Sequence, residues 1–375
     1  YSTSTSSSPW SEVYRVIVAN KAVLTPWEVS GKIDYDNLVE KFGTKPLNHG
    51  DLDRMRDHSG RFHFMLRRGV FYSHRDLDKI LDHHDRGGKF SLYTGRGPSG
   101  PVHLGHLIPW IFTKHLQDTY GSKLLFQFTD DEKMLLKEDL DETIPSHWVH
   151  ENALDLMALG FDPDNTEFIV NMRHASKLFP IALKVAKKIT GSTMRAVFGF
   201  NDQSNLGMMF FPSMQAAPCF LESERAGEPV PCLIPAGIDQ DPYWRLTRDI
   251  ARKLGYPKPA QIHGRMLPGL TGTAKMSSSQ PETAIYMTDV PELVEKKIEY
   301  ANVPEDRANC PLFQFHYFLL TESDEEVEWI RDACTSNRRS CLECKIELAE
   351  DVNRFLKAHR RRKKLIGKSV ETMLE

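Results

Sequence analysis

Two short stretches of the chain carry side chains suited to chemistry at a phosphate group. The first reads GRGPSGPVHLGH and places His103 and His106 directly after a glycine-rich turn. The second reads GLTGTAKMSSS and places Lys275 just ahead of Ser277 and Ser278. Imidazole N–H groups, exposed backbone amides and a mobile lysine all stabilise negative charge on phosphate oxygens. The second stretch in particular has the groups that a triphosphate tail needs during a displacement.

The first stretch must lie between a strand and a helix. Phe90, Leu92 and Tyr93 form a β-prone run that ends in the turn at 95–101, and apolar residues then recur at helical spacing from 104 to 116. A helix that begins near His103 presents unpaired amides and the positive end of its dipole to an anion. Alone, this arrangement is a generic anion site, and the lysine stretch alone is more typical of an exposed polar linker.

The wider chain alternates strand-like and helical segments. Helical patterns at 104–119, 143–159, 176–190 and 241–254 lie between most of the strand candidates, which are 90–93, 124–128, 167–170, 230–235 and 260–263. Such alternation predicts an α/β fold in which crossover helices connect parallel strands. Ligands then bind at the carboxyl ends of the strands, where the glycine-rich turn lies.

Three regions follow from these patterns. Residues 1–85 are expected to form an N-terminal appendage with helices at 33–43, 51–67 and 74–83 and a possible β-hairpin that pairs 13–19 with 21–27. Residues 86–288 are expected to form a Rossmann-like domain with a helical insertion near 193–221. Residues 289–375 are expected to be all-helical, with a last helix at 340–365. That helix ends in the basic run KAHRRRKK (357–364), which suits a solvated face or an RNA backbone equally.

Composition limits the class of protein. With 375 residues, 40% of them hydrophobic and 26% charged, the chain has the balance of a soluble globular protein. No apolar run approaches the roughly 18 residues of a membrane span, and the opening Ser/Thr tract is not a secretory signal. A net charge of -3 gives no overall nucleic-acid signature, so any RNA contact must come from local basic patches. Neither a membrane nor DNA is expected as a partner.

The six cysteines indicate a reducing compartment, and the cytoplasm fits best. Cys341 and Cys344 form a C-x-x-C pair, with Cys310 and Cys334 upstream, so a zinc site has to be considered. The pair lies inside a helical pattern, and the other spacings match no familiar zinc finger. We therefore favour ordinary helical cysteines and assign no metal ligand.

Taken together, the two phosphate-handling stretches resemble the paired signatures of class I aminoacyl-tRNA synthetases. Within that class the chain resembles tryptophanyl-tRNA synthetases of the eukaryotic and archaeal type. The resemblance runs from residue 26 onward and is carried by PWEVSGKIDYD (26–36), YTGRGPSG (93–100), HLGHLIPW (103–110), FQFTDDEK (126–133), FPSMQAAP (211–218), LIPAGIDQDPYWRLTRDIA (233–251) and KMSSS (275–279).

This resemblance implies a Rossmann-like catalytic domain and a helical anticodon-binding domain. It also implies ATP-dependent activation of L-tryptophan, transfer of the tryptophanyl group to tRNA(Trp), Mg²⁺ carried on the ATP phosphates, and a homodimer. Residue by residue, it places the catalytic groups at His103, His106, Lys275, Ser277 and Ser278. The nucleotide contacts fall at Arg96, Gly97, Ser99, Gly105, Gly237, Asp239 and Met276.

Tryptophan differs from the other aromatic amino acids by its indole N–H, which must meet an acceptor in an apolar slot. Glu132, which follows the strand carrying Gln127, supplies a carboxylate acceptor, and Gln127 supplies a second polar group. The resemblance assigns the α-amino group to Tyr93, Gln215 and Gln240. Without it, Glu132 and Gln127 are also consistent with a polar pair at a strand end.

Three other functions stay open at this point. A tyrosyl-tRNA synthetase shares both signatures, although its ligand hydroxyl needs an acidic and phenolic pair. A small nucleotidylyltransferase also uses an H-x-G-H turn but does not need a helical C-terminal domain. The third candidate is a catalytically inactive synthetase-like protein with an RNA-binding or signalling role. Both signatures are intact, which argues against this candidate.

Overall fold

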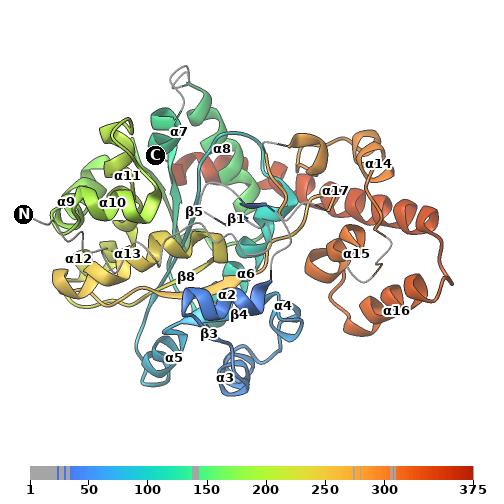
Figure 1. The fold of residues 1–375 in the computed structure, drawn as a ribbon, viewed down its shortest axis with the longest axis horizontal. Coiled ribbons are helices and arrows are strands. Elements are labelled where there is room, and N and C mark those ends of the chain that lie inside the picture. Colours follow the sequence, from blue (N-terminus) through green and yellow to red (C-terminus); the bar gives the residue numbers. More distant parts are fainter. Residues whose placement is uncertain are drawn as a thin grey trace, which may run out of the picture.

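A computed structural model describes residues 23–24, 29–30, 34–136, 143–272, 275–278, 280–304, 307 and 310–374. Its centre is a seven-stranded sheet in the order β3-β4-β9-β8-β5-β6-β7. The sheet is wrapped by helices, with α9 to α13 on one side of the molecule and α14 to α16 at the opposite end (Figure 1). The predicted α/β class is confirmed.

The five central strands are parallel. They are β5 (Ser91–Arg96), β6 (Leu124–Phe128), β7 (Thr166–Val170), β8 (Cys232–Gly237) and β9 (Ala260–Gly264). From β5 the chain adds β6 and β7 on one side, whereas β8 and β9 lie on its other side. The order therefore reverses at β5, and such a switch point opens a crevice at the carboxyl ends of the strands.

Two short strands extend the sheet in the antiparallel direction. The strand β4 (Phe71–Arg75) pairs with β9, and β3 (Lys45–Pro46) pairs with β4. The helix predicted over 74–83 was wrong at its start, because His74 belongs to β4 and α5 begins at Leu77 (Leu77–Asp85). Ser73 and His74 are buried in β4, and Ser73 Oγ lies 3.0 Å from His263 Nδ1 on β9. A partner so distant in sequence gives no local signal.

The helices before β4 differ in detail from the prediction. Instead of one helix over 51–67, the structure has α3 (His49–Ser59) and α4 (Phe64–Arg67), separated by Gly60 in the left-handed region (φ 66°). The helix predicted over 33–43 is α2 (Tyr35–Phe42). The hairpin predicted from 13–19 and 21–27 lies largely outside the described residues. Within them, β1 (Val23–Leu24) pairs in the antiparallel direction with β2 (Val29–Ser30).

Alternate residues of the strands face two hydrophobic cores. Leu124 and Phe126 face a core shared with α6 (Leu104–Tyr120), α8 (Thr143–Met157) and the last helix, α17 (Cys341–Leu374). Tyr93, Leu125 and Ile169 face a second core. That core is covered by α9 (Ala175–Ala186), α10 (Gly191–Phe198), α11 (Leu206–Ala216), α12 (Pro218–Ala226) and α13 (Asp241–Ala251). The helices α10 to α12 cover the segment near 193–221 that was expected to be helical.

The C-terminal region consists of helices. They are α14 (Pro291–Glu299), α15 (Pro311–Phe315) with a π-helical turn at His316–Leu320, α16 (Asp324–Thr335) and α17. The last helix runs to residue 374 rather than 365, because its second half packs against α8 and β7. Apolar residues of α17 such as Val352, Leu356 and Val370 join the first core. The helical region is thus joined to the sheet by a continuous interior.

The basic run of α17 is divided between structural and exposed side chains. Arg360 donates to the carbonyl oxygens of Met287 and Asp289, and Arg362 Nε donates to the Ala158 carbonyl at 2.8 Å. The sequence did not predict these contacts. Lys357, Arg361, Arg362 and Lys364 are exposed. Because Arg362 already donates to a carbonyl, we expect any RNA backbone contact by this run chiefly from the other three.

Asp155 on α8 fastens α17 to the sheet region. Its Oδ1 lies 3.2 Å from His359 Nε2 and 3.0 Å from Lys363 Nζ, and both Asp155 and His359 are buried. We expect Asp155→Ala to lower the free energy of unfolding by about 1–3 kcal/mol, because His359 and Lys363 would lose a buried acceptor, although Lys363 keeps its ion pair with Glu151. Urea denaturation measures the loss. Glu295→Ala, at an exposed carboxylate on α14, is the control, and equal stability of the two variants would contradict the assignment.

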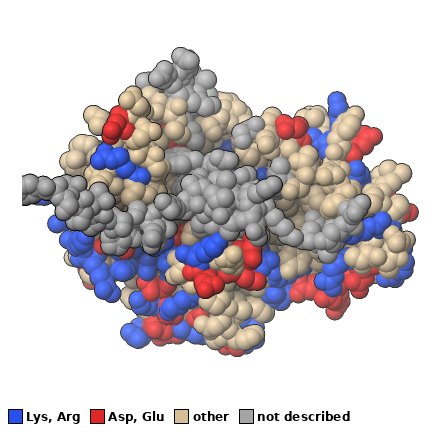
Figure 2. Space-filling model, viewed as in Figure 1, with Lys and Arg blue, Asp and Glu red and all other residues tan. Residues whose placement is uncertain are grey.

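The charged surface has no single sign on the face shown in Figure 2. Lys and Arg lie among Asp and Glu around the lower edge and over the right-hand end of the molecule, as the net charge of -3 leads one to expect. Within the described residues, every helix is too short or too polar to cross a lipid bilayer.

Candidate active site

A cavity of about 440 Å³ opens at the carboxyl ends of β5, β6 and β8. Every site residue predicted from the sequence lines it, although their separate roles stay predictions. They are Tyr93, Arg96, Gly97, Ser99, His103, Gly105, His106, Gln127, Glu132, Gln215, Gly237, Asp239, Gln240, Lys275, Met276, Ser277 and Ser278. These residues come from segments up to 185 positions apart, so the fold alone brings them together.

The two histidines form the start of α6. His103 is the N-cap residue, and its backbone N–H donates to His106 Nδ1 at 3.2 Å. The two rings stack with their centroids 3.5 Å apart. Backbone bonds from Leu104 to Ile285 and from Met287 to Val102 tie this turn to the segment that follows the lysine loop. These backbone hydrogen bonds therefore hold the histidine turn and the lysine loop next to each other.

Both imidazoles are neutral at physiological pH. Burial, together with the nearby Arg96 and Lys275, lowers the pKa of His103 to about 3. The pKa of His106 also lies well below its ordinary value, mainly through burial and the nearby Arg96. His103 Nδ1 has no hydrogen-bond partner among the described residues. The geometry therefore suits N–H donation to an anion rather than two fixed positive charges.

Arg96 supplies a buried positive charge at the end of β5. Its Nη2 donates to the carbonyl oxygens of Gly100 and Pro101 at 3.1 and 2.8 Å, which holds the glycine-rich turn in place. Its Nη1 is buried without a hydrogen-bond partner in the described part of the chain, and burial lowers the pKa of Arg96 to about 9. An unmet guanidinium N–H of this kind suits a phosphate oxygen.

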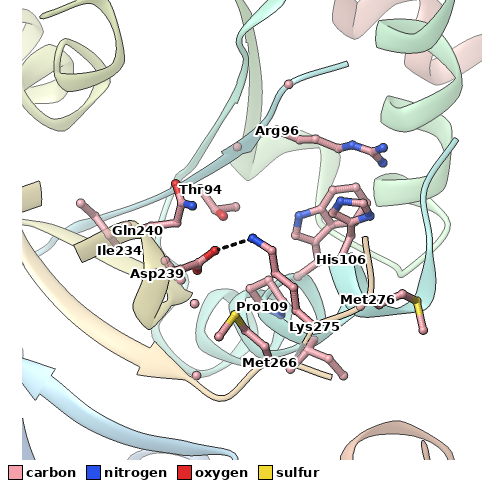
Figure 3. Close-up of a pocket in the computed structure, with 18 of the residues that line it drawn as sticks. Thr94, Arg96, His106, Pro109, Ile234, Asp239, Gln240, Met266, Lys275 and Met276 are labelled. Carbon is pink, nitrogen blue, oxygen red and sulfur yellow. Dashed lines mark hydrogen bonds and ion pairs between the residues drawn. The ribbon is translucent and has the colours of Figure 1, made fainter. Parts of the chain in front are cut away.

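Lys275 enters the cavity from the opposite wall. Its Nζ lies 3.0 Å from Asp239 Oδ2, and Figure 3 shows the side chain reaching toward that carboxylate, with His106 and Arg96 to the other side. The next residue, Met276, is buried and its N–H donates to the Leu267 carbonyl at 2.9 Å. The methionine anchors the loop while the lysine stays half-exposed with a carboxylate partner.

Gly105 lets the histidine turn and the lysine loop pack closely together. A Cβ at this position would lie 3.1 Å from His103 Nδ1 and 3.3 Å from Met276 Cβ. These contacts are tight, so a side chain would push apart the histidine turn and the lysine loop. The predicted close approach of a nucleotide to this backbone stays a prediction.

The other end of the cavity is a polar network around Tyr93 and Gln127. The Tyr93 hydroxyl donates to Gln127 Oε1 and contacts the Gln215 carbonyl oxygen at 2.9 Å. Gln127 Nε2 donates to Asn171 Oδ1 at 2.7 Å and to the Met214 carbonyl at 3.3 Å. Gln127 is thus held by the protein on both ends of its amide, so its direct effect is to orient Tyr93.

Asp131 and Asn171 fix the orientation of that amide. Asn171 Nδ2 donates to Asp131 Oδ1 at 2.8 Å, which leaves Asn171 Oδ1 as the acceptor for Gln127. Burial, with a smaller effect of the neighbouring Asp130, raises the pKa of Asp131 to about 7. The carboxylate therefore changes charge close to physiological pH.

This shift makes stability depend on pH in a defined direction. Between the unfolded value near 3.9 and the folded value of about 7, the native state binds the extra proton. The contribution of Asp131 to the free energy of unfolding is therefore greatest below the unfolded value, and it is lost as pH rises through the folded value of about 7. We expect Asp131→Asn, which keeps the acceptor oxygen, to remove about 1–3 kcal/mol of the loss between pH 5 and 8. Urea denaturation at both pH values measures it, and an unchanged loss would contradict the shift.

Glu132 lies one residue further, in the first turn of α7 (Asp130–Leu136). Thr129 Oγ1 donates to Glu132 Oε2 at 3.1 Å, and the Glu132 charge raises the pKa of Tyr243 beyond the effect of burial. The carboxylate thus lies among aromatic side chains at the closed end of the cavity. An acceptor in such a place is what an indole N–H requires.

Comparison with known proteins identifies the family. A family model described as tRNA synthetases class I (W and Y) matches residues 85–357. The chain is 45% identical over 368 residues to the tryptophan–tRNA ligase of Pyrobaculum arsenaticum, which covers 94% of this chain and 97% of the relative. It is 46% identical over 363 residues to that of Thermococcus kodakarensis, which covers 93% of each chain. The chain belongs to the tryptophan–tRNA ligases of archaeal type.

Solved structures of tryptophanyl-tRNA synthetases have the same fold as this member of the family. The enzyme of Encephalitozoon cuniculi bound to tryptophan is 32% identical, with a TM-score of 0.83 over 91% of this chain and 99% of that one. The enzyme of Plasmodium falciparum is 33% identical, with a TM-score of 0.84 over 92% and 97%. The Rossmann-like sheet and helical C-terminal region inferred for this ligase agree with both.

Sequence reasoning missed several residues of the cavity. Trp244 packs edge-on against Tyr93 with ring centroids 5.2 Å apart, and its Nε1 is buried without a hydrogen-bond partner among the described residues. Thr129 and Asn171 position Glu132 and Gln127. Trp244 ends the GIDQDPYW block, three residues before Thr247. Its position in that block was the signal in the sequence that could have identified it as a cavity residue. Asn171 offered none, because it acts from the end of β7.

Proposed function

We propose that this protein activates L-tryptophan with ATP and transfers the tryptophanyl group to tRNA(Trp). One observation carries the proposal: a single cavity joins a phosphate-binding end, made by Arg96, His106 and Lys275, to an aromatic-lined end that holds Glu132. Family membership supports the same reaction. ATP enters as its Mg²⁺ complex, and the metal lowers the charge of the phosphates that the protein must bind.

The first step is attack of the tryptophan carboxylate on the α-phosphate of ATP, with pyrophosphate leaving. The protein need not form a covalent bond, because alignment of the two reactants and stabilisation of phosphate charge are sufficient. His103 and His106 donate N–H groups from the helix start, and the glycine-rich turn held by Arg96 supplies backbone amides. Lys275 moves from Asp239 to the phosphates, so the lysine exchanges one anionic partner for another and is not left unpaired.

The second step transfers the tryptophanyl group to a terminal ribose hydroxyl of the tRNA. The helical C-terminal region provides the anticodon-binding surface, and the exposed basic residues of α17 lie on it. We expect Lys357→Ala, Arg361→Ala and Lys364→Ala together to weaken tRNA binding. The slope of log affinity against log salt should also flatten by roughly 0.7–0.9 for each phosphate that the protein no longer neutralises. An unchanged slope would make these residues a solvated face.

The protein acts as a homodimer in the cytoplasm. Support for the dimer comes from large apolar side chains exposed on neighbouring helices, Phe179 and Leu183 on α9 and Leu206 on α11. Support for the compartment comes from the cysteines, all of which are free thiols.

The experiment that tests the function is aminoacylation of purified tRNA with labelled tryptophan, followed by acid precipitation. We expect charging of tRNA(Trp) that depends on ATP and Mg²⁺. Charging with labelled tyrosine in place of tryptophan would indicate the tyrosine enzyme. Binding of tRNA without any charging would indicate an inactive synthetase-like protein.

A further inference from the structure

A second cavity, of about 420 Å³, lies at the edge of the sheet opposite to the active site. The active site opens at the carboxyl ends of the parallel strands, whereas this cavity lies where β8 and β9 begin. Pro231, which directly precedes β8, and Ala260, the first residue of β9, line one side of it. The other side is formed by α5 and by Asp76, the residue before that helix. We call this hollow the second cavity.

Strand pairing brings the two sides of the second cavity together. Arg75, the last residue of β4, pairs with Gln261 in β9, so the start of α5 falls beside the segment that leads into β9. Arg248 on α13 fastens the two sides to each other, because its guanidinium group donates to Asp76 Oδ2 at 2.6 Å and to the Pro259 carbonyl oxygen. The second cavity therefore has fixed walls.

The lining of the second cavity carries more positive than negative charge. Its cations are Lys79, Arg86, Arg252 and Lys258, and its carboxylates are Asp76 and Asp82. Both carboxylates already have partners. Asp76 pairs with Lys79 at 2.8 Å and with Arg248 at 2.6 Å, and Asp82 pairs with Arg54 at 3.0 Å. Since Arg248 and Arg54 lie outside the lining, these carboxylates leave most of its positive charge uncompensated.

Three of the four cations have no counter-ion in the described part of the chain. Arg86 follows α5, Arg252 begins the short turn after α13, and Lys258 lies in the segment that leads to β9. None of the three side chains forms an ion pair or a hydrogen bond with a described residue. Cations that share one hollow repel one another, so a ligand with several negative charges would be stabilised there.

The floor of the second cavity is apolar. Ile80 and Ala260 are buried, and the Tyr256 ring stacks on Phe220 with centroids 4.5 Å apart. The Tyr256 hydroxyl donates to Glu224, which holds the ring in place. A hollow of a few hundred Å³ with an apolar floor and converging polar groups is the usual form of a small-molecule site. This shape favours a small anion over the extended backbone of an RNA.

We propose that the second cavity binds a small polyanion that carries a chain of phosphates, either a nucleoside triphosphate or an inorganic polyphosphate. The planar guanidinium groups of Arg86 and Arg252 suit paired hydrogen bonds to phosphate oxygens, and Lys258 adds a point charge. The site is separate from the cavity in which ATP is proposed to react. The inference therefore stands or fails independently of the proposed function.

The test is acetylation of lysines in the full chain, read by mass spectrometry, with inorganic tripolyphosphate or ATP as the probe. At ten times the dissociation constant of the probe we expect acetylation of Lys258 and Lys79 to slow by about tenfold, because about a tenth of the site is then free. Lys253, exposed in the same turn as Arg252 but outside the lining, should react as before. Tighter protection by ATP would identify a nucleotide, whereas equal protection would identify the phosphate chain alone.

A variant of the exposed Arg252 checks the source of the protection. Arg252→Ala should raise the probe concentration needed for half protection of Lys258 by about 10–10²-fold, the effect of losing a hydrogen bond between charged groups. Lys253→Ala removes the same charge from the next residue and should keep the wild-type value.

Three results would overturn the proposal. One is that neither probe protects Lys258 in the wild type. Another is that Arg252→Ala is protected as well as Lys253→Ala. The third is that tRNA alone protects Lys258, which would make the second cavity part of an RNA-binding surface.

Discussion

Lys275→Ala is expected to slow adenylate formation by about 10²–10³-fold, the loss typical of removing one preorganised group that stabilises charge in the transition state. Lys275 is placed for this role by Met276, which is buried and fixes the loop, while the lysine Nζ stands 3.0 Å from Asp239. ATP phosphates would take the place of Asp239 as the partner. Rapid-quench measurement of tryptophanyl-adenylate gives the rate.

The same variant should bind tRNA nearly as well as the wild type, because Lys275 lines the cavity, whereas the exposed basic residues proposed to contact tRNA are on α17. Lys253→Ala, at an exposed lysine just after α13, is the matched control and should leave both measurements unchanged. Full adenylate formation by the Lys275 variant would show that the loop has no part in the chemistry. A parallel loss of tRNA binding would point to misfolding instead.

Glu132→Ala is expected to lower kcat/KM for tryptophan by roughly 10–10²-fold, since a hydrogen bond to a charged group contributes about 1.5–3 kcal/mol. The carboxylate is positioned by Thr129 Oγ1 at 3.1 Å and lies near Tyr243. Because the effect concerns the indole end of the cavity, KM for ATP should change little. Steady-state pyrophosphate exchange at varied tryptophan and varied ATP separates the two.

The conservative variant Glu132→Gln serves as the comparison. Its amide oxygen still accepts a hydrogen bond, so we expect a loss smaller than that of the alanine variant. Glu228→Ala, at an exposed carboxylate beyond α12, controls for a general effect of charge. An equal loss for ATP and tryptophan, or no loss in the alanine variant, would remove Glu132 from indole recognition.

Much of the sheet was predictable because its parallel strands are buried on both faces and read as short apolar runs. The strands β5, β6, β7, β8 and β9 all match predicted segments within a few residues. The antiparallel strand β4 was not predicted. Its buried Ser73 pairs with His263 on β9, and the Leu77 N–H at the start of α5 donates to His74 Nδ1, contacts that the local sequence does not reveal.

The cavity residues were predictable where residue types and their spacing indicate a chemical role, as in the histidine turn and the lysine loop. What the sequence could not provide is the network that orients them. Gln127 was expected to meet the substrate, yet its amide is occupied by Tyr93, Asn171 and a backbone carbonyl. These partners come from three separate strands and helices, so their meeting depends on the packed fold.

The last helix also shows that the sequence did not predict which contacts its side chains make. Its basic run has the composition of an RNA-binding face, but Arg360, Arg362 and Lys363 are used to hold α17 to the sheet region. Charge composition describes what a segment is able to contact, whereas packing decides which contact is made. For this reason only the structure distinguishes the exposed Arg361 from Arg360 and Arg362, its two neighbours in the sequence.

The most direct test of tryptophan activation is ATP–pyrophosphate exchange measured separately with each of the twenty amino acids. The predicted result is exchange with tryptophan that exceeds exchange with tyrosine or phenylalanine by about 10⁴-fold or more, the discrimination that a site built around a buried acceptor achieves. Exchange driven by tyrosine instead of tryptophan, or by none of the twenty, would contradict the account.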